Sequence, residues 1–469
     1  MNKIKAFFLV ALAVLVAAPA FAETQNVKVS GSIDAYAFYR NNFDLTENND
    51  AGSVPSTGTV PGAVHSGTDL TAQQSEADEF FMTITQIQIA ADLTDNVSTV
   101  INLVNQRDWN ANEYGGATSG ASHEFDVLLD LAYVQMKEIF YSPLTLTIGR
   151  QDLVFGRGFV IGWNPQDPNS NTQADEFSQL LSFDAIRATL DFNPWTLDFV
   201  YSKITEGSLN PEDDRDLYLA NMNYKFAEYN AVAEGYYFGE VNRVGASTGS
   251  RSNSTHTVGG RVQFDPISQI TLGGELAYQF GDYFSSTATS SRDRSAWALD
   301  IFGEYRWDSN WKPMLGIEYV YLSGEEDLST TSSGEYGAWN GSFRLPVYGC
   351  IHDYREGYFA TGSSSDQVAG QNQQHVAIYG SIKPLDDMQL SAQYYHFWTT
   401  ETAHSTITSP SSASLSEHIG DEIDLLLTYN YTADVTFNTY ADFFIPGDMF
   451  SSPNDAMATQ LIQEVKVTF

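Results

Sequence analysis

Apolar and polar residues alternate along most of the chain, in segments of about ten residues that are separated by polar connections. A period of two predicts a β-strand with one apolar face and one polar face. We predict about eighteen such strands, each long enough to cross a bilayer when tilted. They cover residues 27–40, 80–93, 97–106, 125–137, 144–151, 183–192, 195–203, 216–226, 230–239, 256–264, 269–280, 295–307, 312–322, 375–383, 388–398, 421–431, 434–444 and 460–469.

The connections between these segments alternate between short and long. The short ones, such as "TDN" and "NP", hold only a few residues, and the long ones include 41–78, 107–124, 152–180, 323–374 and 399–417. Tight turns at one end and long loops at the other are typical of outer-membrane barrels, and a soluble sandwich does not require this order. The sequence therefore predicts an all-β fold. We expect a transmembrane, antiparallel, up-and-down β-barrel in the bacterial outer membrane.

The two faces of each predicted strand differ as a membrane barrel requires, with lipid outside and water inside. The segment 295–307 shows this most clearly. Its predicted outer face carries Trp297, Leu299, Ile301, Tyr305 and Trp307, and its predicted inner face carries Asp300, Glu304 and Arg306. Tyrosine and tryptophan near strand ends would form the interfacial girdles.

The two ends of the chain agree with an outer-membrane location. Lys3 and Lys5 precede an apolar run over residues 6–18, and Ala20-Phe21-Ala22 resembles a cleavage site. This pattern predicts a signal peptide over residues 1–22, with a retained anchor as the alternative, and a barrel over residues 23–469. The last segment, "LIQEVKVTF", ends on an aromatic residue. It resembles the C-terminal signal by which bacterial barrels engage the barrel-assembly machinery; the alternative is an ordinary edge strand.

Composition and charge narrow the function classes. The chain carries 23 basic and 59 acidic residues, a formal net charge of −36, and 13% aromatic residues. Such an acidic protein is not expected to bind nucleic acid through bulk charge. A single cysteine, Cys350, excludes an internal disulfide. The expected partners are the lipid bilayer with its lipopolysaccharide, the barrel-assembly machinery, and hydrophilic solutes or polysaccharide.

The segment "LTIGRQDLVFGRGFVIG" (146–162) ends an alternating strand with closely spaced glycines and arginines. A phosphate-binding loop would place such glycines before a helix. Here a polar loop follows instead, so we interpret the segment as a barrel strand followed by a glycine-hinged loop that can fold back into the lumen. Its arginines are candidates for a pore constriction.

Residues 131–162, "LAYVQMKEIFYSPLTLTIGRQDLVFGRGFVIG", followed by "FDAIRATLDF" (183–192), resemble the alginate-export family of outer-membrane porins. The resemblance rests on the strand with Tyr-Val-Gln, the tight turn after it, and the motifs Gly-Arg-Gln and Phe-Gly. It also rests on the next strand, which begins with Phe-Asp. "FRLPVYGCIHDYREGYF" (343–359) echoes a long loop of that family. The resemblance implies an eighteen-stranded barrel that passes anionic exopolysaccharide through an arginine-lined pore.

Strand alternation assigns more acidic than basic residues to the predicted inner wall. The basic positions are Lys28, Arg40, Arg187, Lys225, Arg261, Arg306, Lys383 and Lys466. The acidic positions are Asp34, Asp92, Asp126, Asp130, Asp191, Asp198, Glu234, Glu275, Asp300, Glu304, Glu318, Asp424, Asp442 and Glu464. A wall with this charge does not favour a polyuronate. The predicted function is therefore passive diffusion or export of hydrophilic solutes, with alginate as one candidate. The alternatives are a general or cation-preferring porin, and a non-conducting adhesin or enzyme.

The candidate pore residues come from this wall and from the motif that carries the resemblance. They are Arg150, Gln151, Asp184, Arg187, Asp191, Arg261, Glu304 and Arg306. Strict alternation would place Arg150 on the outer face, unless a bulge at Gly149 turns it inward. The alternative for Arg187 is a structural pair with an acidic neighbour in the wall.

Other features are weaker. Seven aromatic residues also face inward by alternation, either to stack sugars or to pack beneath a loop: Tyr36, Phe38, Tyr236, Phe302, Tyr395, Phe397 and Tyr440. The eight histidines show no metal-ligand spacing, and we expect alternation to spread "SEHIGDE" (416–422) over two faces. Acidic loops such as 46–50 and 75–79 are expected to be solvated and not to bind calcium. We predict no catalytic residue, no metal and no cofactor.

Overall fold

A single ring of β-strands forms the molecule in the computed structural model. The structure describes residues 26–43, 45, 78–109, 127–164, 172, 174–206, 214–243, 253–284, 291–326, 334–355, 371–401, 416–450 and 455–469. The predicted signal peptide, the acidic loop at 46–50 and Asp126 lie outside these residues. No helix in the described part of the chain is long and apolar enough to cross a membrane.

Eighteen strands account for almost all of the regular structure. They are β1 (Asn26–Asn41), β2 (Asp78–Thr94), β3 (Val97–Asp108), β4 (Leu128–Met136), β5 (Leu144–Gln151), β6 (Phe183–Asp191), β7 (Trp195–Thr205), β8 (Arg215–Lys225), β9 (Val232–Asn242), β10 (Asn253–Ile267), β11 (Ile270–Tyr283), β12 (Arg292–Arg306), β13 (Met314–Leu322), β14 (Gln373–Leu385), β15 (Met388–Trp398), β16 (His418–Asn430), β17 (Val435–Pro446) and β18 (Ala458–Thr468). Two short 3₁₀ helices, η1 (Ile139–Tyr141) and η2 (Asp175–Phe177), and one short helix, α2 (Cys350–Arg355), lie between them.

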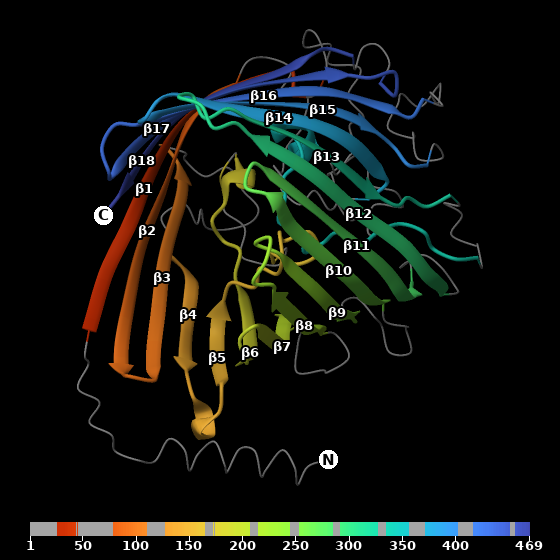
Figure 1. Ribbon diagram of the computed structural model, residues 1–469. Coiled ribbons are helices and arrows are strands. Elements are labelled where there is room, and N and C mark those ends of the chain that lie inside the picture. Colours follow the sequence, from red (N-terminus) through yellow and green to blue (C-terminus); the bar gives the residue numbers. More distant parts are fainter. Residues whose placement is uncertain are drawn as a thin grey trace, which may run out of the picture.

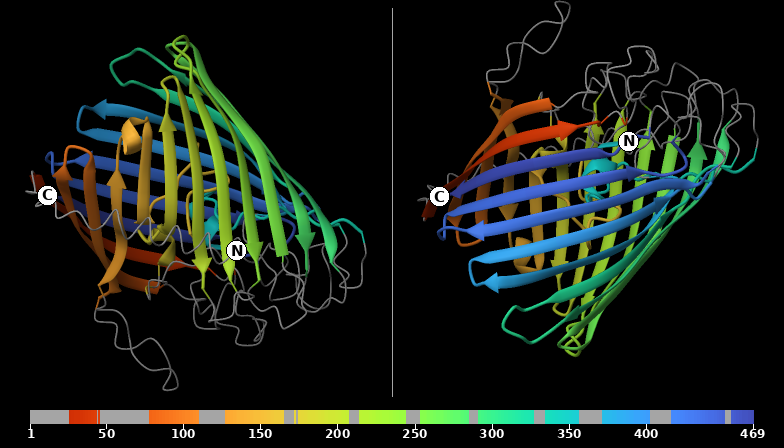
Figure 2. Two further views of the ribbon diagram at one scale, coloured as in Figure 1. Left: turned by 90° about the horizontal axis from the view of Figure 1, so that it is seen from below. Right: turned by 90° about the horizontal axis from the view of Figure 1, so that it is seen from above.

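Each strand pairs with its neighbours in the sequence, and the first strand pairs with the last. The closing ladder between β1 and β18 is antiparallel and runs from Ser32 opposite Thr468 to Asn41 opposite Thr459. Figures 1 and 2 show the resulting ring, in which β18 lies beside β1. Closure leaves no unpaired strand edge, which the absence of water in a bilayer requires. The predicted all-β, up-and-down, antiparallel transmembrane barrel is confirmed.

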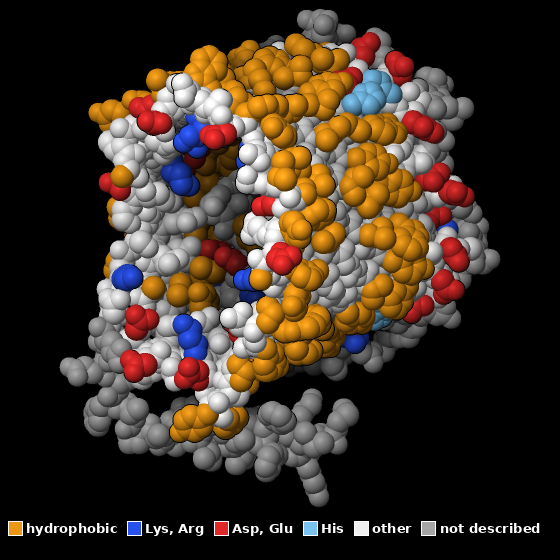
Figure 3. Space-filling model, viewed as in Figure 1, with side chains coloured by type: hydrophobic (Ala, Val, Ile, Leu, Met, Phe, Trp, Pro, Cys, Tyr) orange, Lys and Arg blue, Asp and Glu red, His pale blue; other side chains and the backbone are white. Residues whose placement is uncertain are grey.

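The two faces of the strands differ in side-chain exposure and polarity, as the alternation predicts. On β12, the Trp297 side chain on the outside is 48% exposed, whereas Asp300 on the inside is 3% exposed. Apolar side chains cover much of the outer surface, and charged side chains of both signs surround a hollow in the molecule (Figure 3). The outer surface is thus matched to lipid, and the inner one to water.

Several strands continue beyond the predicted segments at the end of the barrel that carries the long connections. β12 starts at Arg292 and β10 at Asn253, three residues before the apolar alternation begins. These extensions are polar, because a strand that projects past the bilayer no longer needs an apolar outer face. Hydrophobic alternation therefore marks the part of a strand in the membrane and misses the part above it.

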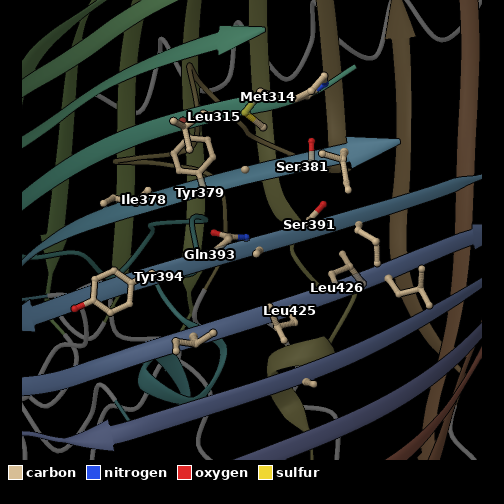
Figure 4. A pocket seen from close by; sticks show the side chains of 18 of the residues that line it. Met314, Leu315, Ile378, Tyr379, Ser381, Ser391, Gln393, Tyr394, Leu425 and Leu426 are labelled. Carbon is tan, nitrogen blue, oxygen red and sulfur yellow. The ribbon is translucent and has the colours of Figure 1, made fainter. Parts of the chain in front are cut away.

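A shallow apolar groove crosses the outer surface over β13 to β17 (Figure 4). Its floor follows one row of paired residues, in which Leu315 lies opposite Gly380, Gly380 opposite Ala392, Ala392 opposite Leu425, and Leu425 opposite Ala441. Small residues at three of these positions hollow the surface between the larger ones. The groove belongs to the lipid-facing surface and not to the lumen.

Candidate functional site

The connection after β5 turns into the lumen. Within residues 152–164, the amide of Gly158 donates to the carbonyl of Phe155 at 2.9 Å, and the amide of Phe155 donates to the carbonyl of Ile161 at 3.2 Å. The side chains of Leu153, Phe159 and Ile161 are buried. The hypothesis of a glycine-hinged loop that folds back into the barrel is confirmed for these residues.

Arg157, at the tip of this loop, is held by the opposite wall. Its Nη1 donates to Oδ2 of Asp300 on β12 at 2.8 Å, and its Nη2 donates to Oε1 of Glu318 on β13 at 2.7 Å. The guanidinium carbon lies 4.1 Å from the ring centroid of Phe302. A planar fork that binds two carboxylates and stacks on an aromatic ring fixes both position and orientation.

Two further arginines approach the same tip from β6 and β10. The guanidinium of Arg187 lies 5.1 Å from the ring of Phe155, and its Nε donates to Oδ1 of Asp198 at 2.8 Å. A Cβ on Gly156 would meet Cδ of Arg261 at 3.2 Å and Oε2 of Glu234 at 3.0 Å. The wall therefore lies close to the tip, and Gly156 adopts φ +59°, which favours glycine.

We call these side chains the loop-tip cluster; its members are Arg157, Arg187, Glu234, Arg261, Asp300 and Glu318. Arg261 pairs with Glu234, with 3.4 Å between Nε and Oε2. Nη1 of Arg261 is buried without a hydrogen-bond partner among the described residues. Two predicted site residues, Arg187 and Arg261, thus meet at one level of the lumen, together with Arg157.

A second segment, residues 334–355, lies inside the barrel against the first. The amide of Gly162 donates to the carbonyl of Phe343 at 2.8 Å, and the amide of Leu345 donates to the carbonyl of Gly158 at 2.9 Å. A Cβ on Gly158 would lie 2.8 Å from Cβ of Leu345, so this glycine permits the close approach. The two inward segments support each other through their backbones. Part of the long connection at 323–374 thus lies inside the barrel.

The short helix α2 docks this second segment onto the wall, as Figure 2 shows inside the ring. Glu422 of β16 accepts hydrogen bonds from the amides of Ile351 at 2.7 Å and His352 at 2.8 Å. Arg344 donates to Asp353 at 3.0 Å, with both side chains buried. Burial raises the pKa of Asp353 to about 6, although Arg344 opposes the shift.

Several of the inward aromatic residues are covered by η2 and α2. Phe177 of η2 lies 5.3 Å from Tyr36 and 5.4 Å from Phe38, measured between ring centroids. His352 of α2 stacks on Phe397 at 3.8 Å. For these residues the structure supports packing beneath a loop, the alternative to sugar stacking.

Four of the predicted pore residues occupy other positions. Arg150 lies on the outer face, where its Nη1 is 3.4 Å from Oδ2 of Asp184, whose side chain is 66% exposed. The expectation that Arg150 and Asp184 line the pore is wrong, because β5 keeps strict alternation and no bulge at Gly149 turns Arg150 inward.

Gln151 is buried and donates to the carbonyls of Thr147, Gly149 and Ala185, so its amide caps a strand end. Asp191 accepts from the amide of Asn193 in a tight turn.

Glu304 and Arg306 lie at the end of β12 that carries the short turns. Arg306 contacts Glu304 and donates to Oγ1 of Thr271 at 2.8 Å. The hydroxyl of Tyr379 donates to Glu304 at 3.1 Å. This pair therefore lies toward the rim that carries the short turns, on the same strand as Asp300 of the loop-tip cluster.

The expectation that alternation places the histidine and the aspartate of "SEHIGDE" on two faces is also wrong, although Glu422 of the same segment does face the lumen. The register between β15 and β16 shifts so that Phe397 lies opposite Gly420 and Trp398 opposite His418, which leaves Ile419 as an extra residue. This bulge changes the parity of the strand. His418 and Asp421 therefore share the outer face, with 3.3 Å between Nε2 and Oδ2.

Buried acidic side chains outnumber buried basic ones in the described part of the chain, by sixteen to five. The five basic residues are Arg40, Arg215, Arg292, Arg294 and Arg344. Arg215 pairs with Glu240 at 2.6 Å and Arg292 with Glu325 at 2.6 Å. The sign of this imbalance agrees with the acidic excess predicted for the inner wall.

The chain is similar to known proteins in sequence and in fold. A family model described as alginate export matches residues 62–463. No curated protein matches the sequence. Among solved structures, OccK9 (OpdG) of Pseudomonas aeruginosa has a TM-score of 0.53 at 10% identity, covering 95% of this chain and 99% of that one.

Two further structures from Pseudomonas aeruginosa are similar to the same extent. OpdK, solved with vanillate, has a TM-score of 0.52 at 10% identity and covers 95% of this chain and 100% of its own. OccK8 (OprE) has a TM-score of 0.51 at 12% identity, with coverage of 95% and 98%. At such low identity the likeness shows the barrel fold alone.

Proposed function

Since the chain belongs to the alginate export family, we propose that this outer-membrane channel passes small hydrophilic solutes through a lumen narrowed by its own inward segments, and that it favours cations. The observation that carries the proposal is the loop-tip cluster, in which Arg157 ties the inward loop to Asp300 and Glu318. A loop held across the lumen sets the width of the path, and the charge around it sets the selectivity.

The interior charge supports a preference for cations. The guanidinium groups of Arg157, Arg187 and Arg261 each contact a carboxylate, so their positive charge is largely compensated. The remaining carboxylates give the buried residues an acidic excess. In a narrow, low-dielectric passage this field raises the local concentration of cations and opposes the entry of anions.

Arg187 and Arg261 are the residues that we propose to contact a solute. Arg187 engages Asp198 through Nε, and its side chain is 29% exposed. Guanidinium nitrogens beside a narrow path can donate to hydroxyl or carboxylate oxygens. A second candidate solute is therefore an alginate-like polysaccharide, which the family description names.

We further propose that the chain carries out no catalysis and that its insertion depends on the barrel-assembly machinery. The Cys350 thiol supports the first point. Burial raises its pKa, and the carboxylates of Asp424 and Asp442 raise it further. The thiol therefore stays protonated and is a poor nucleophile. Passage is passive, governed by width and charge.

The test is electrical. The purified protein is inserted into planar bilayers, and the reversal potential is measured in a potassium chloride gradient. We expect stepwise conductance with the sign of cation selectivity. An anion-selective channel would contradict the proposed selectivity, and a barrel that never conducts would contradict the channel itself.

A pair of matched variants separates lumen charge from surface charge. Glu304→Gln removes a carboxylate from the lumen rim, whereas Asp184→Asn removes one from the outer face. We expect Glu304→Gln to reduce the cation preference and Asp184→Asn to leave it unchanged. Block of the current by oligouronates, at concentrations where neutral oligosaccharides have no effect, would favour the polysaccharide candidate.

A further inference from the structure

We propose that His396, His418 and Asp421 form a binding site for a divalent transition-metal ion of the zinc class, on the outer face of the barrel. The three residues lie at the ends of β15 and β16 that carry the long connection between them. One donor atom from each lies within 4.8 Å of the others. The site is separate from the lumen, and it goes beyond the channel function proposed above.

The geometry of the donors is close to that of a metal site. Nδ1 of His396 lies 2.8 Å from Oδ1 of Asp421, and Nε2 of His418 lies 3.3 Å from Oδ2 of the same carboxylate. The two imidazole rings stack with centroids 4.8 Å apart. Ligand atoms about 2.0–2.2 Å from a tetrahedral zinc ion are about 3.3 Å from one another. Small side-chain rotations therefore suffice to place an ion between the three groups.

The bulge at Ile419 makes the site. Under strict alternation His418 and Asp421 would point to opposite faces of β16. The extra residue changes the parity, so that both join His396 on the outside. Gly420 has a φ of +154°, and a Cβ at this position would lie only 2.5 Å from the carbonyl oxygen of Ile445. The backbone irregularity thus depends on a glycine.

The donor set selects the class of ion. Two imidazole nitrogens and one carboxylate suit zinc, copper, nickel or iron, whereas calcium and magnesium prefer oxygen ligands. The side chains of His396, His418 and Asp421 are 43%, 33% and 23% exposed, so water can complete the coordination. An ion held here would join β15 to β16 at the end of the barrel that carries the long connections.

A neighbouring tyrosine orients the carboxylate. The hydroxyl of Tyr394 donates to Oδ1 of Asp421 at 2.6 Å. With Oδ1 held in this way, Oδ2 remains directed toward His418. Hydrogen bonds of this kind to a ligating group commonly change metal affinity about 10-fold to 100-fold when they are removed.

The experiment uses the full chain in detergent and Zn²⁺ as the probe. Isothermal titration should show one saturable site per chain. We expect His396→Ala, His418→Ala and Asp421→Asn each to weaken binding at least about tenfold, and Tyr394→Phe to weaken it by about 10-fold. With Cu²⁺ as a second probe, electron paramagnetic resonance should show two nitrogen ligands in the unmodified protein.

His256 is the matched control, because it is a strand histidine that forms a hydrogen bond with the hydroxyl of Tyr237 at 2.8 Å and belongs to no cluster of potential metal ligands in the described part of the chain. His256→Ala should leave zinc binding unchanged. Heat-dependent migration in electrophoresis confirms that each variant barrel folds, and Asp421→Asn provides a conservative variant. Equal zinc affinity in the unmodified protein and the His396→Ala/His418→Ala double variant would overturn the proposal.

Discussion

The role of each charged residue depends on whether the backbone directs its side chain to the outer face of the barrel or into the lumen. Arg150 and Arg157 belong to one short segment, yet Arg150 pairs with Asp184 on the outer face and Arg157 reaches Asp300 and Glu318 inside. Arg150 follows the alternation of β5, whereas Arg157 lies beyond the strand in a glycine turn. The same residue type therefore contributes to the surface in one case and to the lumen in the other.

Removal of the Arg157 side chain should loosen the inward loop. In Arg157→Ala, Asp300 and Glu318 lose their shared cation, and charged hydrogen bonds of this kind contribute about 1.5–3 kcal/mol each. The tip should then detach from the wall, and single-channel conductance should rise with more frequent fluctuations. Planar-bilayer recordings would measure both quantities.

Two further variants serve as comparisons for Arg157→Ala. Arg157→Lys keeps the charge but not the planar fork, so it should give an intermediate conductance. Arg150→Ala acts on the outer face and should leave the conductance unchanged. An Arg157→Ala channel with unmodified conductance and noise would show that the loop tip does not limit the path.

At the scale of elements, short segments inside the barrel rely on the wall for their conformation. α2 is too short to be stable alone, and its first amides are satisfied by Glu422 of β16. The loop after β5 and the segment at 334–355 share backbone hydrogen bonds. The inward elements therefore form one connected layer, which any change at its anchors should disturb.

The docking of α2 should depend on pH through Asp353. Its pKa when docked is about 6, because burial disfavours the charged carboxylate, whereas an unperturbed aspartate has a pKa of about 3.9. The docked state thus holds the proton more tightly. Docking should be strongest below about pH 4, weaken as the pH rises to about 6, and change little above that value. Conductance measured across this range should increase with pH.

Asp353→Asn isolates this group, because an amide stays neutral at every pH. Conductance of the Asp353→Asn channel should lose most of the change between about pH 4 and 6. If the variant keeps the full pH dependence of the unmodified protein, another group is responsible and the assignment to Asp353 is incorrect.

At the scale of the whole molecule, closure between β1 and β18 completes the barrel. The amide of Gly31 donates to the carbonyl of Phe469 at 2.8 Å, and the amide of Phe469 donates back at 3.0 Å. The Phe469 ring also covers Gly31, where a Cβ would lie 2.7 Å from its Cζ. A glycine on one strand thus receives the aromatic ring of the other at the seam.

Phe469→Ala should weaken this seam. The lost cross-strand contact is worth about 0.2–1 kcal/mol, and it exposes the backbone at Gly31. We expect the barrel to lose its compact electrophoretic form at a lower temperature than the unmodified protein. Phe199→Ala, which removes an outward ring from the middle of β7, is the control. Equal temperatures for Phe469→Ala and the unmodified protein would argue against a role for the ring in closure.

The alternation of residues determined most of the architecture without any knowledge of contacts. Each predicted segment corresponds to one of the strands, because a strand between lipid and water must change polarity at every residue. The same rule placed Arg187, Arg261 and Asp300 inside and Trp297 outside. An inward loop after β5 followed from its glycines and apolar residues.

The tertiary structure alone decided which residues meet. Arg157 pairs with Asp300 and Glu318 only because the loop crosses the lumen. His396 and His418 share a face only because Ile419 forms a bulge, which a two-residue period does not encode. Alternation is a local property that fixes the face of a residue, whereas contacts across the lumen and changes of parity arise from closure and packing, so neither can be obtained from the sequence pattern alone.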